Sequence, residues 1–128
     1  MYTSRTGEVS EMLVGLEYLR KEWEVFTPVG HDTQVDLVVI KGARIKRVQV
    51  KSVYDCGGLL RANIDHNGEA KYTSERVDVL VCVWQNKIWS IPMEDVEGET
   101  TLNFGRLDGV VSKPRNGFDH TKYLVKEK

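Results

Sequence analysis

The stretch that decides the fold is residues 36–51, DLVVIKGARIKRVQVK. An apolar run follows Asp36, and a short glycine turn separates it from a second run that ends in Gln49-Val50-Lys51. Two such runs joined by a tight turn are typical of a β-hairpin. Because side chains alternate along a strand, Gln49 and Lys51 share one face and Val50 lies on the other. The hairpin therefore brings an acid, an amide oxygen and a lysine to one edge of a small sheet.

Outward from this hairpin, the pattern predicts one long helix and further strands. Apolar residues at helical spacing predict a helix that begins with Thr6 as its N-cap, ends near Glu22 and turns an apolar stripe to the core. The stripe consists of Val9, Leu13, Leu16, Leu19 and Trp23. Strands are expected at residues 24–27, 35–40, 45–53, 59–64, 77–84 and 88–91. A helical turn at 72–76 and a terminal helix at 119–126 complete the expected elements.

The length and composition are those of one ordinary globular domain. The chain has 128 residues, 41% of them hydrophobic and 29% charged, so we expect a single domain over residues 1–128. No apolar run has the length of a membrane span, and the first residues lack the apolar centre of a signal peptide. Cys56 and Cys82 lack the spacing of a zinc site, so we expect two free thiols in a reducing, cytoplasmic setting, with a nucleoid or viral context left open.

The charge is close to balanced in total but uneven along the chain. The formal net charge is −1, yet residues 41–53 hold five basic side chains and no acid, and the segment of about 105–128 is also basic. Local patches decide where a phosphate backbone docks, although a solvated hairpin has the same composition. The residues expected to contact DNA are Gln34, Arg44, Lys46, Arg47, Ser52, Lys113 and Arg115.

The order of these elements resembles the PD-(D/E)xK nuclease superfamily, and most of all its Holliday junction resolvases and small group I intron homing endonucleases. The resemblance is carried by TGEVSEMLVGLEYLRKEWEVFTPVG (6–30), DLVVIKGARIKRVQVKS (36–52) and YTSERVDVLVCVWQNKIWSIP (72–92). In such proteins a glycine lies four residues before a helical glutamate, which matches Gly7 and Glu11. Asp36 matches the motif aspartate and Lys51 the motif lysine. Gln49 departs from the usual Glu or Asp, but some homing endonucleases of this fold have the same QxK.

The resemblance implies an α/β fold with a restriction-endonuclease-like core, a mixed central β-sheet flanked by helices in the order α-β-β-β-α-β. It implies a Mg²⁺-dependent DNA endonuclease, with Mn²⁺ as a substitute, in which Glu11, Asp36, Gln49 and Lys51 are catalytic. The metal ligands would be Asp36, Gln49, the Val50 carbonyl and Glu11, with Lys51 assisting the attacking water. Because an amide brings no charge, Glu11 has to supply the second negative charge, and Glu8 is its rival for that role.

The implied partner is duplex or branched DNA, and no membrane is expected. Cutting both strands needs two sites related by symmetry, so we expect a homodimer or homotetramer. Sequence-specific cleavage and junction resolution both stay open. Two other functions also stay open: a catalytically inactive nucleic-acid-binding or interaction module on the same fold, with Gln49 as the mark of a decayed site, and a nuclease directed at RNA.

Overall fold

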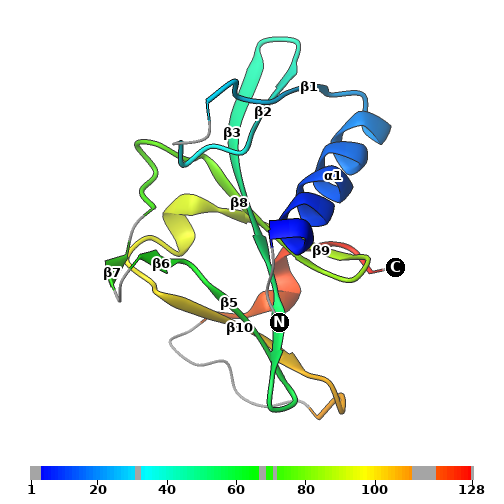
Figure 1. Ribbon diagram of the computed structural model, residues 1–128, viewed down its shortest axis with the longest axis vertical. Helices are drawn as coiled ribbons and strands as arrows, with labels where there is room; N and C mark the ends of the chain where they lie inside the picture. Colours follow the sequence, from blue (N-terminus) through cyan, green and yellow to red (C-terminus); the bar gives the residue numbers. More distant parts are fainter. Residues whose placement is uncertain (1–3, 31–32, 67–68, 71, 111–117, 128) are drawn as a thin grey trace.

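The computed structural model describes residues 4–30, 33–66, 69–70, 72–110 and 118–127. Its centre is a six-stranded mixed sheet in the order β1-β2-β3-β8-β9-β11 (Figure 1). Neighbouring strands are antiparallel except β3 and β8, which are parallel. The strands are β1 (Glu24–Phe26), β2 (Leu37–Lys41), β3 (Arg44–Ser52), β8 (Val79–Trp84), β9 (Lys87–Pro92) and β11 (Leu124–Lys126). The mixed α/β architecture expected from the sequence is confirmed.

The β2–β3 hairpin forms as the sequence predicts. Its register pairs Lys41 with Arg44 at the turn and Leu37 with Val48 at the open end. Gly42 at the turn has a φ of 61°, a conformation that costs glycine little. This local turn fixes the register of the whole hairpin, and so it fixes which part of β3 lies beside the start of β2.

The helix α1 (Ser4–Arg20) lies across one face of this sheet (Figure 1). It has begun by Ser4, so the N-cap predicted at Thr6 is wrong. At its other end Glu22 takes a φ of 66°, and the Trp23 amide donates to the Tyr18 carbonyl at 3.0 Å. This is the Schellman arrangement that commonly stops a helix. It turns the Trp23 ring back against Tyr18, with centroids 5.7 Å apart.

The face that α1 buries is not the one that its apolar stripe predicts. Four large apolar side chains of the helix are instead exposed: Val9, Met12, Leu16 and Leu19. The buried side chains are Ser10 and Val14, and the Ser10 hydroxyl lies 2.6 Å from that of Ser52 on β3. Two buried hydroxyls satisfy each other in this way. Of the predicted stripe, Leu13 packs partly against the same core, as does Tyr18 of the helix.

A second, three-stranded sheet lies on the other side of the central sheet. Its order is β10-β5-β4, and its strands are β4 (Tyr54–Cys56), β5 (Leu59–Asn63) and β10 (Thr101–Arg106). The remaining elements are β6 (Asp65–His66), β7 (Glu69–Ala70) and the 3₁₀ turns η1 (Met93–Asp95) and η3 (His120–Tyr123). The two layers bury separate cores, because β8 sends Val79, Val81 and Val83 toward α1 and Leu80 and Cys82 toward the second sheet.

The second flanking helix of the expected order does not occur among the described residues. The strand expected at 59–64 forms instead as β5, between β3 and β8 along the chain, its residues 59–62 alternate between half-buried and buried, and Gly57 and Gly58 have φ of 62° and 91° in the turn before it. Alternation after a glycine turn favours a hairpin, so this segment becomes sheet. The helix predicted at 119–126 is also wrong, because η3 is followed at once by β11, which pairs with β9.

The state of the cysteines and the length of the helices can also be read from the structure. Cys56 is exposed and Cys82 is buried, and both are free thiols as predicted. Within the described ranges, no helix has the length and apolar character needed to cross a membrane.

Candidate active site

Asp36 is fixed at the head of β2 by two contacts with β3. Its amide donates to the Val48 carbonyl at 2.8 Å, and its Oδ2 accepts the Val50 amide at 2.9 Å. The second bond uses a main-chain donor of the strand that carries Gln49 and Lys51. The carboxylate is therefore held against the middle of the predicted motif, as the hairpin pattern requires.

Glu11 reaches the same point from α1. Burial, the charge of Asp36, a hydrogen bond between the two carboxyl groups and the charge of Glu8 together raise the pKa of Glu11 to about 7. Two carboxylates at this range repel each other unless a proton or a cation lies between them. Glu8, the rival acid, acts here only through its charge, so the structure brings Glu11 rather than Glu8 to Asp36.

Gln49 is buried on β3, next in sequence to the Val50 amide that holds Asp36. Its Nε2 donates to the Val50 carbonyl at 3.3 Å, while its Oε1 is buried without a hydrogen-bond partner among the described residues. An unpaired buried acceptor costs about 1–3 kcal/mol, so a ligand for this oxygen is expected. Two carboxylates, an amide oxygen and a main-chain carbonyl are the oxygen ligands that Mg²⁺-type cations prefer, and the residues present therefore fit such an ion.

The charge of this donor set is low. In the part of the chain that the structure describes, no group of three or more His, Cys, Asp and Glu side chains is placed to hold a metal. Glu11 and Asp36 are therefore the two charged ligands available, and Gln49 and the Val50 carbonyl would complete the set with neutral oxygens.

Lys51 lies on the face of β3 that looks toward the second sheet. Its Nζ is 5.0 Å from the centroid of the Tyr72 ring, a cation–π distance, and Tyr72 is buried. Its neighbour in register is Cys82, where burial raises the pKa of the thiol and the Lys51 charge opposes that rise. Tyr72 thus positions the lysine ammonium. An aromatic residue before β8 is the only sign of this role that the sequence contains.

The structure gives two of the predicted DNA-contact residues internal partners. The Ser52 hydroxyl is buried against Ser10. Arg47 bonds both oxygens of Asp78, through Nε at 3.0 Å and Nη2 at 2.9 Å, and also donates to the main-chain carbonyls of Ser74 and Glu75. Both side chains therefore join elements of the fold, and their DNA contacts stay predictions.

The other predicted contact residues are dispersed. Arg44 and Lys46 lie over the Trp23 ring, at 4.9 Å and 5.2 Å from its centroid. Gln34 is half-buried, and its Oε1 has no hydrogen-bond partner among the described residues. Lys113 and Arg115 lie outside the described residues. The predicted contacts thus do not form one surface in the described structure.

The raised pKa of Glu11 predicts how the stability of the metal-free protein depends on pH. Below about pH 4.5 Glu11 is protonated in both the folded and unfolded states, but between about 4.5 and 7 only the folded state keeps the proton. The unfolded state then binds fewer protons, so the free energy of unfolding falls as pH rises through this window. In EDTA, we expect Glu11→Gln to remove that part of the fall in melting temperature. Glu8→Gln is the matched control, and parallel curves for wild type and Glu11→Gln would contradict the assignment.

The chain is similar to known proteins in sequence and in fold. A family model described as PD-(D/E)XK endonuclease matches residues 1–111. Protein 5.3 of Escherichia phage T7 is 27% identical over 105 residues, which span 79% of this chain and 89% of that protein. The solved structure of a bacterial homing endonuclease, I-Ssp6803I, superposes with a TM-score of 0.74 at 19% identity, and the match covers 96% of this chain and 86% of that one. The last comparison shows that the restriction-endonuclease-like fold is shared.

Proposed function

We propose that this chain, which belongs to the PD-(D/E)XK endonuclease family, cleaves DNA with the help of a divalent cation held at Asp36 and Glu11. The observation that carries the proposal is the contact between these two carboxyl groups at the Val50 amide. They come from elements far apart in the sequence, and their proximity costs free energy unless a cation offsets it. Gln49 supports the same proposal, because its buried Oε1 has no hydrogen-bond partner in the part of the chain that the structure describes.

The chain's own residues would divide the work as follows. Asp36, Glu11, Gln49 and the Val50 carbonyl would hold Mg²⁺ or Mn²⁺. The ion, when bound, activates water and offsets the charge that develops on the phosphate. Asp36 is kept in place by the Val50 amide, so its charge stays at the edge of β3 throughout the reaction. Ser10 and Ser52 join α1 to β3 at 2.6 Å and so hold Glu11 in register with Asp36.

Lys51 completes the proposed site from the other face of β3. Its ammonium group donates to the attacking water and orients it toward the phosphorus. Tyr72 limits where the ammonium can lie, because the ring face attracts the cation at 5.0 Å. Among the described residues no carboxylate pairs with Lys51, so nothing there draws its ammonium group away from the water.

The experiment that tests the proposal is a cleavage panel with purified protein. Supercoiled, linear and four-way-junction DNA and single-stranded RNA are each incubated with Mg²⁺, with Mn²⁺ and with EDTA. Metal-dependent cleavage of DNA that Lys51→Ala abolishes is the expected result, and the preferred substrate separates sequence-specific from junction cleavage. Folded protein that leaves every DNA intact overturns the proposal, and cleavage of RNA alone replaces it with an RNA-directed nuclease.

The neutral Gln49 gives the rival function its support. That rival is a non-catalytic nucleic-acid-binding module on the same fold. A site with two carboxylates carries less negative charge than one with three, so it attracts a divalent cation less strongly. Calorimetric titration with Mn²⁺ separates the two functions. Binding that Asp36→Ala removes supports the enzyme, and no Asp36-dependent binding supports the module. The cytoplasmic location expected from the sequence stays a prediction.

We further propose that the chain works as a homo-oligomer that pairs through the outer face of α1. Val9, Met12, Leu16 and Leu19 recur at spacings of three and four residues and are 42–74% exposed. A stripe of this kind is suited to a second helix, and a two-fold pairing would use the same stripe on both copies. The helix also carries Glu11, so this pairing would fix the separation of two catalytic sites, as cutting two strands requires.

Charge on this stripe is expected to break the oligomer. We expect Met12→Glu/Leu16→Glu to be a monomer by sedimentation equilibrium where wild type is a dimer or tetramer, because the interface would bury two carboxylates per copy. Val29→Glu is the control, since Val29 is fully exposed and lies off the helix. A monomeric wild type, or a double variant that still assembles, would rule out this interface.

A further inference from the structure

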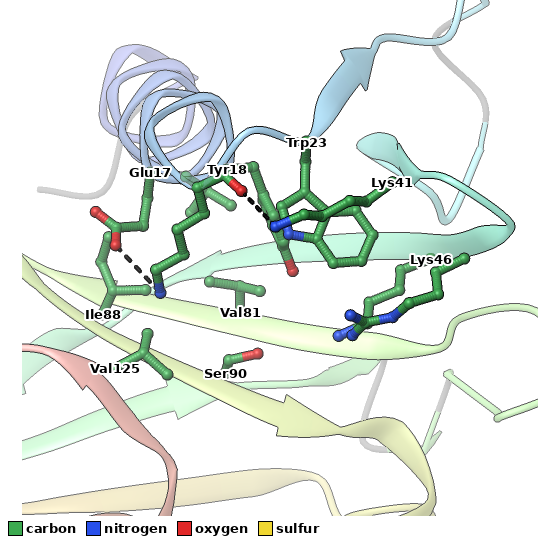
Figure 2. A pocket seen from close by; sticks show the side chains of 12 residues that line it. Glu17, Tyr18, Trp23, Lys41, Lys46, Val81, Ile88, Ser90 and Val125 are labelled. Carbon is green, nitrogen blue, oxygen red and sulfur yellow. Dashed lines mark hydrogen bonds and ion pairs between the residues drawn. The ribbon is translucent and has the colours of Figure 1, made fainter.

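A pocket of about 510 Å³ lies between the C-terminal half of α1 and the central sheet (Figure 2). Residues of α1, the β2–β3 hairpin, β8, β9 and β11 line it, so it forms only when the whole layer is assembled. Its volume is in the range of about 300–1,000 Å³ that is usual for small-molecule sites.

The pocket lies on the opposite flank of α1 from the two catalytic acids. Glu11 meets Asp36 beside β2, near one end of the strand order, while Glu17 lies within 4.0 Å of Lys126 on β11, at the other end. Six residues separate Glu11 from Glu17, which places them about 120° apart around the helix. The pocket is therefore separate from the proposed metal site.

Positive charge is in excess around the pocket. Four cations line it, Lys21, Lys41, Arg44 and Lys46, against the single acid Glu17. Glu17 already pairs with Lys21 at 3.3 Å, and the Lys41 Nζ donates to the Lys21 carbonyl at 2.9 Å, at the negative end of the helix (Figure 2).

Arg44 and Lys46 carry the uncompensated part of this charge. Within the described ranges no carboxylate comes within 4.0 Å of either side chain. Burial and the charge of Arg44 lower the pKa of Lys46, and Lys21 contributes in the same direction while Asp78 opposes it. An anion between these side chains would relieve their mutual repulsion, and phosphate suits both an arginine and a lysine.

The rest of the pocket is apolar and aromatic, with one polar pair. Tyr18 meets Trp23 edge to face, and Val81 and Ser90 lie on the strands below them (Figure 2). Burial raises the pKa of Tyr18, and a hydrogen bond with Ser90 opposes the rise. The ring therefore offers a neutral hydroxyl beside apolar surface, which suits the body of an aromatic ligand with polar edges.

We propose that this pocket binds a nucleotide, with the phosphate between Arg44 and Lys46 and the base and sugar toward Trp23 and Tyr18. A free nucleoside monophosphate and the terminal nucleotide of a DNA strand share this chemistry. The site is independent of catalysis, because it needs neither the metal nor the acids that hold it.

The test is calorimetric titration of the full chain in EDTA, which removes metal-mediated binding at Asp36. The probes are thymidine monophosphate, a short single-stranded oligonucleotide and inorganic phosphate. We expect nucleotide binding that Arg44→Glu/Lys46→Glu weakens by about tenfold or more, since two charge-assisted bonds are lost. Lys122→Glu, an exposed charge reversal elsewhere, is the control. Arg44→Gln/Lys46→Gln replaces the charge-reversed variant if that one does not fold.

Tryptophan fluorescence is a second measurement, and it tests whether the ligand lies beside Trp23. Nucleotide binding is expected to change the tryptophan fluorescence of wild type, and Trp23→Phe is expected to lose that change although Trp84 and Trp89 remain. Binding of the monophosphate assigns the pocket to a free nucleotide, and binding of the oligonucleotide alone assigns it to a strand end. No binding of either probe, equal binding by the charge-reversed variant, or inorganic phosphate bound as tightly as the nucleotide would overturn the proposal.

Discussion

Asp36→Asn is expected to abolish most DNA cleavage while leaving the fold intact. The asparagine keeps an oxygen that can accept the Val50 amide, which Asp36 Oδ2 accepts at 2.9 Å, but it removes one of the two charged ligands. Loss of a charge-stabilising group at a reaction centre typically costs about 10²–10³ in rate, and here metal binding weakens as well. Cleavage rates and Mn²⁺ calorimetry on the same preparation measure both effects.

Asp36→Asn is expected to lower activity but to raise the stability of the metal-free protein. Burial, the largest cause, remains in the variant, but the repulsion by the Asp36 charge disappears, so the pKa of Glu11 falls toward its usual 4.5. In EDTA above pH 7, Asp36→Asn is therefore expected to melt at a higher temperature than wild type. Asp55→Asn is the matched control, because Asp55 likewise accepts a main-chain amide, that of Gly58, at 2.8 Å. Wild-type cleavage and metal binding in Asp36→Asn would refute the proposed metal site.

Trp89→Ala is expected to be the most destabilising single substitution considered. Trp89 is 1% exposed and packs between the sheets, with its ring centroid 4.7 Å from that of Phe104 and 6.3 Å from that of His120. Emptying such a site costs about 3–5 kcal/mol of the free energy of unfolding. A domain of this size has only about 5–15 kcal/mol in total, so a large share would be lost.

Urea unfolding in EDTA measures this loss. Trp89→Phe is the matched variant, since it keeps an aromatic ring and removes an Nε1 that has no hydrogen-bond partner among the described residues. We expect Trp89→Phe to lose much less of the free energy of unfolding than Trp89→Ala. Trp84→Ala, at a half-buried position, is the second control. A loss for Trp89→Ala no larger than the roughly 0.5 kcal/mol of a surface substitution would show that the second sheet does not depend on this contact.

The local parts of the site could be predicted from the sequence because they depend on short-range rules. The alternation of residues 45–53 fixed the common face of Gln49 and Lys51, and the glycine turn set the register with β2. Asp36, as the first residue before that strand, then had to lie beside the QxK segment. Each of these steps involves residues close in the chain, where strand geometry leaves few choices.

Other features of the site depended on contacts between distant segments. The apolar period of α1 indicated the wrong buried face. The helix docks through Ser10, which bonds Ser52, and through Val14, and it leaves Val9, Leu16 and Leu19 exposed. When apolar side chains lie on more than one face of a helix, periodicity alone does not say which face meets the sheet.

The sequence by itself therefore determined the hairpin, the four polar residues of the motif and the α/β class. The tertiary structure alone decided which helical acid meets Asp36, that Arg47 joins Asp78, and that Arg44 and Lys46 lie over Trp23. The physical reason is the range of the interactions. Turn and strand preferences act over a few residues, whereas pairs of charged groups and contacts between cations and aromatic rings form only after residues 21 to 31 positions apart have been packed together.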